Sequence, residues 1–302
     1  CHLDRFWNEI SDGENDIIFP EVKKFLLNGD ISRNNFKLNL IFPKLKSVAL
    51  IGNVADKNCL ANMKGLKKLA LVTDTIEEHK LDGIFANNNN LTGIGLTKPR
   101  RPETMHSIAK HLTKLETLLV ISPGENFLFR ANNSPVYEFP LVTYFGMVFH
   151  TMSEAFAIGE PSFSLPHLKR LTMQGYYVQD RIVNFIEHFK ELEILELFVR
   201  DYDPIQCIEK LKHIKEFTTN FHKNRFAPLK KMFKNFDKES KLQTLKFEHF
   251  DEPLYQKYEK KMKKFNIHLE NSLKPAWTLS QEKPIGTGKN YLVPQVVETL
   301  IK

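Results

Sequence analysis

Apolar residues recur along this chain in a six-residue phrase, not at a simple helical or strand period. "FPEVKKFLLNGD" (residues 19–30) and "FPKLKSVALIGN" (residues 42–53) both place apolar residues at phrase positions one, four and six. A helix would repeat every 3.6 residues or so, and a plain strand would alternate. With conservative apolar replacements, the phrase occurs ten times at intervals of 21 to 28 residues, opening at Val22, Leu45, Leu66, Leu91, Leu115, Val142, Leu168, Leu192, Ile214 and Leu242.

The spacing predicts one short strand in each phrase. Positions four and six are two residues apart, so both point to one side of a strand, and position one reaches the same core from the preceding turn. Between strands, residues 181–189 ("RIVNFIEHF") and 225–236 ("RFAPLKKMFKNF") have the apolar spacing of helices. Strands stack at about 4.8 Å whereas helices need about 10 Å. We therefore expect a curved stack with a parallel sheet on the concave side and helices mostly on the convex side.

The ten phrases resemble leucine-rich repeats of the helix-bearing, ribonuclease-inhibitor-like kind over about residues 19–250. Irregular repeat lengths and the phrases "FPKLKSV" and "LPHLKRL" resemble the repeat region of F-box leucine-rich-repeat proteins. The chain departs from the family three places after phrase position six, where Asn or Cys is usual and only Asn53 fits. The resemblance implies a right-handed α/β solenoid. It also implies the substrate-binding region of a ubiquitin-ligase adaptor, with an F-box upstream of Cys1.

The repeat pattern divides the chain into three parts. We expect residues 1–18 to be a helical cap or the end of a truncated upstream region. Residues 19–269 should form the solenoid, about ten repeats and a closing strand near Phe265–Leu269. Residues 270–302 lack the phrase, and we expect a capping tail over the final coil, anchored by Trp277 and Tyr291, because solenoids need capped ends.

Composition is that of a soluble globular protein, with 42% hydrophobic and 26% charged residues. No apolar run approaches the roughly 18–20 residues of a membrane span. Cys1, Cys59 and Cys207 form no close pair, which favours a reducing compartment, cytoplasmic or nuclear. Two glycosylation sequons, at Asn90 and Asn132, keep open a secreted or effector-type binding protein without a ligase link.

The net charge of +7 is concentrated in one segment. Residues 222–264 contain 13 Lys or Arg and 6 Asp or Glu, and 13 − 6 equals the whole excess. The lysines oppose apolar residues on the predicted helices, which is typical of a solvated convex face. An acidic protein partner and nucleic acid are the alternatives. Nucleic acid is the less favoured, since the aromatic residues occupy core positions and are not displayed for stacking.

The sequence offers little for catalysis. "IGTGK" (residues 285–289) has Lys283 where a phosphate-binding loop needs glycine. His106 and His111 are five residues apart, on different helix faces, so they do not form a metal pair. No Ser or Cys lies in a recognisable nucleophile motif. We expect a non-catalytic protein without metal or cofactor.

Phrase positions three, five and seven should face the concavity, and this row supplies the candidate site. Apolar, aromatic and Arg residues there are not required by the repeat, and they are the usual anchors of protein interfaces. We expect a protein partner to contact Leu119, Ile121, Tyr144, Val148, Arg170, Ile194, Glu196 and Phe198. The alternative is that a loop, residues 123–140, covers this face.

Overall fold

The structure is a computed structural model of the 302-residue chain. It describes residues 18–28, 38–52, 59–73, 77–124, 128, 136–149, 161–175, 182–199, 211–220, 240–248, 252–272 and 300. Several predicted features lie outside these residues: the helix at 225–236, Cys1, Cys207, Trp277, Tyr291 and the 285–289 loop.

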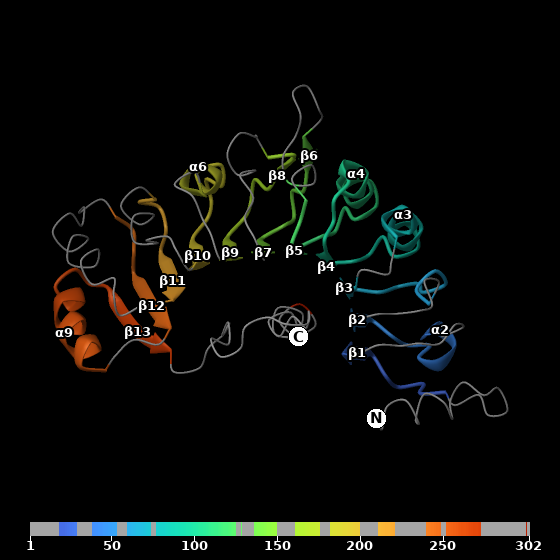
Figure 1. The fold of residues 1–302 in the computed structure, drawn as a ribbon, viewed down its shortest axis with the longest axis horizontal. Helices are drawn as coiled ribbons and strands as arrows, with labels where there is room; N and C mark the ends of the chain where they lie inside the picture. The colour runs from blue at the N-terminus through green and yellow to red at the C-terminus, as the bar shows by residue number, and fades with distance from the viewer. Residues whose placement is uncertain are drawn as a thin grey trace, which may run out of the picture.

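One parallel sheet of eleven strands organises the described chain (Figure 1). Each strand pairs with the one from the neighbouring repeat, in chain order. The strands are β1 (Lys24–Asn28), β2 (Ser47–Ile51), β3 (Lys68–Val72), β4 (Gly93–Thr97), β5 (Thr117–Ile121), β7 (Tyr144–Val148), β9 (Arg170–Gly175), β10 (Ile194–Val199), β11 (Glu216–Asn220), β12 (Thr244–Glu248) and β13 (His268–Ser272).

The first ten of these strands begin at phrase position three of the ten repeats, so the prediction of a long parallel sheet is confirmed. The closing strand β13 begins at His268, three residues later than the strand expected near Phe265. Phe265 itself is 41% exposed, whereas Ile267 and Leu269 are buried. The apolar alternation, not the first aromatic residue, therefore marks where this strand joins the sheet.

Helices pack on one side of the sheet, called here the first face. They are α2 (Leu38–Ile41), α3 (Glu78–Asn87), α4 (Pro102–His111), α6 (Ile182–Ile186) and α9 (Glu252–Lys263). Their buried residues, such as Phe85, Ile108 and Met262, join the same core as phrase positions one, four and six. Figure 1 shows these helices outside the row of strands. The helix predicted at 181–189 is present as α6, and Phe189 beyond its end is also buried.

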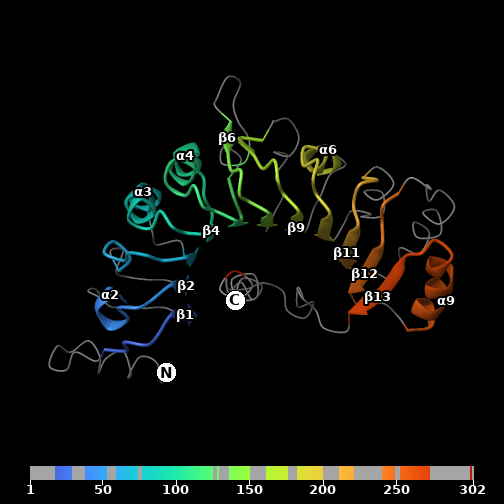
Figure 2. The same ribbon diagram turned by 180° about the vertical axis from the view of Figure 1, so that it is seen from behind.

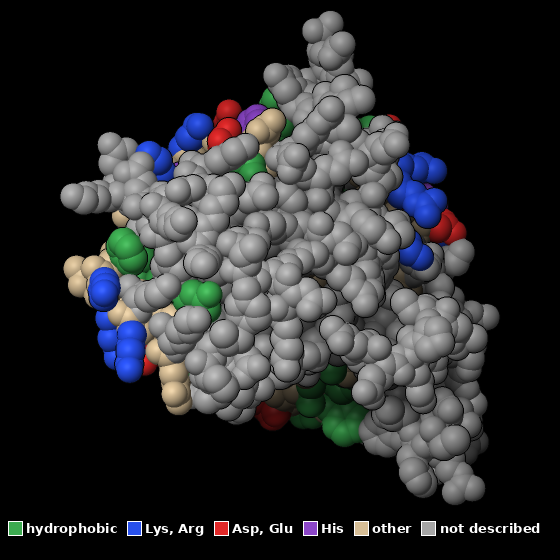
Figure 3. Space-filling view, turned by 60° about the vertical axis from the view of Figure 1, so that its left-hand side comes forward, with side chains coloured by type: hydrophobic (Ala, Val, Ile, Leu, Met, Phe, Trp, Pro, Cys, Tyr) green, Lys and Arg blue, Asp and Glu red, His purple; other side chains and the backbone are tan. Residues whose placement is uncertain are grey.

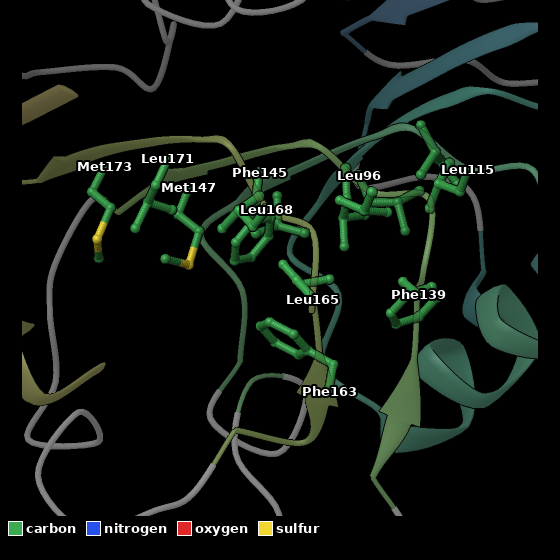
Figure 4. Close-up of a cluster of buried hydrophobic side chains, with 14 of the residues drawn as sticks. Leu96, Leu115, Phe139, Phe145, Met147, Phe163, Leu165, Leu168, Leu171 and Met173 are labelled. Carbon is green, nitrogen blue, oxygen red and sulfur yellow. The ribbon is translucent and has the colours of Figure 1, made fainter. Parts of the chain in front are cut away.

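The core of the first face, called the first core, is continuous from repeat to repeat. Phe145, Phe217 and Phe247 are among its largest fully buried side chains. Phe145 meets Phe163 edge to face, with ring centroids 5.2 Å apart. Figure 4 shows Phe145 beside Leu168, with Phe163 and Leu165 closing the same cluster. Each repeat thus buries its apolar side chains against its neighbours.

The described part of the 123–140 segment packs on the first face. Leu128 and Phe139 are buried in the first core. The short strand β6 (Tyr137–Glu138) pairs in parallel with β8 (Phe163–Ser164), on the helix side of the sheet (Figure 1). The expectation that this segment could cover the other face is therefore wrong for these residues, because their apolar side chains complete the first core.

Asn88 links two consecutive repeats through a fully satisfied buried amide. Its Oδ1 accepts a hydrogen bond from the Leu66 backbone N–H at 3.0 Å. Its Nδ2 donates to the Met63 and Ile84 carbonyl oxygens, both at 2.9 Å. The side chain is 1% exposed. Asn88 thus supplies a cross-repeat connection three residues before phrase position one, not after position six.

His213, in the turn before β11, gives the fold a pH dependence. Burial, together with the charges of Lys190 and Lys241, lowers the pKa of His213 from its ordinary value of 6.5. The unfolded chain therefore binds a proton more readily than the folded chain does. The contribution of His213 to stability is complete above about pH 6.5 and is lost as the pH falls through the lowered pKa.

We expect His213→Gln to reduce the loss in the free energy of unfolding that occurs as the pH falls from 7.5 to 5.0. Urea unfolding at pH 7.5 and pH 5.0 should show a smaller difference between the two pH values for the variant than for the unmodified chain. His79→Gln is the control, because its side chain is 64% exposed. An equal loss of stability between the two pH values in all three proteins would contradict the prediction.

Candidate functional site

The other side of the sheet, called the second face, carries phrase positions three, five and seven. A second buried cluster lies there, separate from the first core, and is called the second core. It consists of Ala49, Ile51, Ala70, Val72, Leu119, Ile121, Val148, Phe198 and Leu300, with Tyr144 packed against it. Leu300 packs on this face against Gly93 and Gly95 of β4. Figures 1 and 2 show the helices on the opposite side of the strands. The alternation of phrase positions therefore assigns the two faces correctly.

All eight predicted contact residues lie on four neighbouring strands, β5, β7, β9 and β10. The expectation that they are exposed is wrong for half of them. Leu119, Ile121, Val148 and Phe198 are between 1% and 5% exposed. Their burial in the second core, together with Leu300, explains the difference.

Exposure across the second face is graded along the strands. At phrase position three, Thr117, Tyr144, Arg170 and Ile194 are half-buried neighbours in register. On the same strands, the residues at position seven are buried. The accessible part of this face is therefore the row at the beginning of the strands.

Arg170 and Glu196 form a two-point ion pair within that row. Arg170 Nη2 donates to Glu196 Oε1 at 2.6 Å, and Nε donates to Oε2 at 3.2 Å. Burial lowers the pKa of Arg170, but the Glu196 carboxylate more than offsets it, so the pKa lies above its ordinary value. The Arg170 side chain is 42% exposed and Glu196 only 12%. The carboxylate thus holds a guanidinium whose outer surface stays available.

Thr172 and Tyr144 extend this network. The Thr172 hydroxyl lies 2.5 Å from Glu196 Oε2 and 3.2 Å from the Tyr144 hydroxyl. Because Thr172 has one hydroxyl proton, it donates to the carboxylate and accepts from Tyr144. Arg170 Cζ lies 5.1 Å from the centre of the Tyr144 ring, a cation–π contact. Burial raises the pKa of Tyr144, which keeps the phenol neutral and able to donate.

Beyond β10 the second face becomes charged. Lys246 Nζ on β12 lies 3.3 Å from a carboxylate oxygen of Glu270, its register neighbour on β13, and 3.7 Å from one of Glu216, two residues before its register neighbour on β11. These side chains are 32% to 42% exposed. Exposed pairs of this kind contribute about 1 kcal/mol or less, so they define the polar edge of the site and add little stability.

Several residues that shape the second face were not predicted from the sequence. Gly93 and Gly95 leave room for Leu300, and Gln174 is 2% exposed between Val148 and Phe198 in register. The glycines and Gln174 were visible in the row of positions three, five and seven, but their roles depend on burial. Leu300 lies outside the repeat. It was expected over the final coil, yet it packs on β4.

A serine, a histidine and an aspartate come together between α3 and α4. Ser107 Oγ donates to Asp82 Oδ1 at 2.7 Å, and His111 Nε2 lies 3.0 Å from the same oxygen. The Ser107 hydrogen bond lowers the pKa of Asp82, assisted by His111 and opposed by burial. In a serine triad the histidine lies between the serine hydroxyl and the carboxylate and acts as the base. Here Ser107 and His111 both contact the Asp82 carboxylate directly. The cluster joins two helices and has no arrangement for acyl transfer.

In the part of the chain that the structure describes, no group of three His, Cys, Asp or Glu side chains is placed to hold a metal ion. Within the same residues, every helix is too short or too polar to cross a membrane.

The basic segment is described in part, through α9. Lys260, Lys263 and Lys264 are exposed, while Tyr258 and Met262 are buried in the first core. Lys263 pairs with Glu259 at 3.2 Å. In the space-filling view, the visible Lys and Arg side chains form separate groups with Asp and Glu beside some of them (Figure 3). This arrangement is that of an ordinary solvated helix surface.

Comparison with known proteins adds little. No protein-family model and no curated protein matches the chain. Among solved structures, it resembles a crystal structure of a Bacteroides fragilis protein from the Northeast Structural Genomics Consortium, with a TM-score of 0.46 and 10% sequence identity. The alignment covers 71% of this chain and 68% of the other. A similarity of this degree supports no conclusion on family or function, so the function is argued from the residues themselves.

Proposed function

We propose that the protein is a non-catalytic recognition protein that binds a protein partner through the second face of its sheet. The observation that carries the proposal is the half-exposed row of Tyr144, Arg170 and Ile194, which lie side by side on β7, β9 and β10. An aromatic ring, a guanidinium and an aliphatic side chain on a rigid sheet are the usual anchors of a protein interface.

The row is already organised before a partner arrives. Glu196 and the Tyr144 ring hold Arg170, and Thr172 holds Glu196 and Tyr144. Side chains fixed in this way lose little conformational entropy on binding, which favours affinity. A partner with an acidic group beside an apolar one fits the exposed surface of this row.

The finer identity belongs to the same proposal. The strand phrases support a right-handed, curved leucine-rich-repeat solenoid of the ribonuclease-inhibitor-like kind, with the second face as its concave side. The substrate-binding role in an F-box ubiquitin-ligase adaptor rests on the phrase resemblance alone. It is tested by whether the natural protein carries an F-box module before Cys1 and binds a ligase scaffold through it.

We expect Arg170→Gln to weaken partner binding by about 2 kcal/mol, roughly 30-fold in Kd. The variant keeps a hydrogen-bonding group near Glu196 but removes the charge that faces the partner. The measurement is a quantitative comparison of proteins retained by immobilised wild-type and variant chains, followed by titration of the retained protein.

Lys169→Gln is the matched control. Lys169 is the adjacent residue, is similarly exposed at 46%, and also pairs with a carboxylate, Glu191, at 2.8 Å. It precedes β9 and lies outside the second-face row. Equal losses in both variants, or none in Arg170→Gln, would show that the partner binds elsewhere.

A further inference from the structure

Leu300 packs on the second face against β4, a strand about 200 residues earlier in the chain. It is 2% exposed and belongs to the second core. A Cβ atom built on Gly93 would lie 2.9 Å from Leu300 Cδ1, and one on Gly95 would lie 3.3 Å from Cδ2.

Gly93 and Gly95 together form a notch of leucine size. Neither has a positive φ, so a side chain would be compatible with the backbone of β4. In register on either side, Gly95 has Ala70 and Leu119, which supply apolar walls. What the two glycines provide is therefore space for the side chain of Leu300.

Gln174 is a second, independent indication of a ligand on this face. Its Oε1 and Nε2 are both buried and have no hydrogen-bond partner among the described residues. A buried unpaired amide costs about 1–3 kcal/mol, so such groups are rare unless a ligand satisfies them. A peptide group presents one N–H and one C=O, which complement the acceptor and donor of a glutamine side chain.

The two features suit a single peptide segment. Gln174 on β9 lies three strands from β4 and is in register with Thr97, two residues beyond Gly95, so it is about 16 Å from Gly95 at the usual strand spacing and rise. About five residues of extended chain cover that distance. Residues 292–302, "LVPQVVETLIK", carry several apolar side chains besides Leu300 and are long enough.

We propose that the second face is a docking site for a leucine-bearing peptide segment, with its notch filled in cis by Leu300. A partner segment of the same chemistry enters by displacing it: its leucine occupies the Gly93–Gly95 notch, and its backbone pairs with Gln174. This proposal rests on the proposed function, because it assumes that the partner binds the second face. The partner therefore binds the Tyr144–Ile194 row and displaces Leu300 from the notch in the same step, so the partner and Leu300 compete.

The direct test uses the full 302-residue chain and a fluorescent synthetic peptide of residues 290–302 as the probe. We expect Leu300→Asp to empty the notch, so that the peptide binds this variant at least tenfold more tightly than the unmodified chain. The cis segment competes in the unmodified chain at an effective concentration of about millimolar. A peptide with aspartate at the Leu300 position should not bind.

Substitutions in the notch identify the site. In the Leu300→Asp chain, Gly93→Val should weaken peptide binding at least tenfold by filling the notch. Gly83→Val is the matched control, because a Cβ at Gly83 meets nothing within 4 Å.

Several outcomes would overturn the proposal. A Leu300→Asp chain that unfolds would make Leu300 an inseparable part of the core. A Leu300→Asp chain that folds but does not bind the peptide would contradict the notch as its binding site. Equal peptide affinities for Gly93→Val and Gly83→Val, each in the Leu300→Asp chain, would contradict it as well. As a second measurement, alkylation at position 300 in Leu300→Cys, quantified by mass spectrometry, should accelerate with saturating peptide; an unchanged rate would contradict displacement.

The docking proposal and the proposed function predict different results, so an experiment can contradict one without the other. If the face recognises a partner but the cis segment does not compete, the partner binds the unmodified and Leu300→Asp chains equally, and Arg170→Gln still weakens it. If the docking is right but the function is wrong, the peptide binds as described while Arg170→Gln leaves partner binding unchanged.

Discussion

Replacing Phe145 by alanine should lower the free energy of unfolding by about 3–5 kcal/mol. Phe145 is fully buried in the first core, at phrase position four of its repeat, and its ring packs edge to face against Phe163. Removing the ring forfeits its transfer free energy and leaves a cavity. The strands on either side hold the backbone of β7 in place, which limits collapse of that cavity. Urea unfolding followed by circular dichroism measures the loss.

Phe265→Ala is the comparison for this substitution. Phe265 is 41% exposed in the turn before β13, so the same change should cost less than about 1 kcal/mol. Similar losses for the two variants would mean that the face assignment of the phrase is wrong at β7.

Replacing Asn88 by alanine should cost about 3 kcal/mol or more, although the residue is polar and its neighbours are all asparagines. The substitution leaves the Leu66 N–H and the Met63 carbonyl buried without the amide that now satisfies them. Each unsatisfied backbone group costs about 1–3 kcal/mol. The loss should appear in equilibrium unfolding and as faster amide hydrogen exchange at Leu66.

Asn87→Ala serves as the control at the adjacent position. Asn87 is exposed and makes a hydrogen bond to the Ala61 carbonyl at 3.0 Å. Its removal should change stability by about 0.5 kcal/mol, because water replaces the lost partner. If both variants lose the same stability, the Asn88 amide does not connect the repeats in the way its contacts indicate.

Much of the fold could be predicted because each repeat encodes the same physical requirement. Leu91, Ile94 and Leu96 must reach one core from a turn and a strand, so their spacing alone fixes the start of β4 and its buried face. The same reasoning holds for ten strands. It placed β13 less well, because Phe265 is apolar yet ends the preceding turn instead of entering the core.

The candidate site could be predicted in part. Alternation placed Arg170 and Glu196 on one face and on neighbouring strands, but it could not show that Glu196 accepts from Thr172 as well as Arg170. It treated Leu119 and Phe198 as exposed, since local spacing contains no information on a residue that arrives from the distant position 300. Asn88 was missed for a related reason: its partners lie 22 and 25 residues away.

The position of a bound partner tests most directly whether the second face is the recognition surface. A photo-crosslinking phenylalanine analogue is introduced at position 194, half-buried in the row beside Arg170, or at position 141, which is 49% exposed in the turn before β7. The protein retained by the unmodified chain should crosslink several-fold more at position 194 than at position 141, and Arg170→Gln should reduce the crosslink at 194. Preferential crosslinking at position 141 would contradict recognition through this face. A crosslinking yield at position 194 that Arg170→Gln leaves unchanged would contradict it as well.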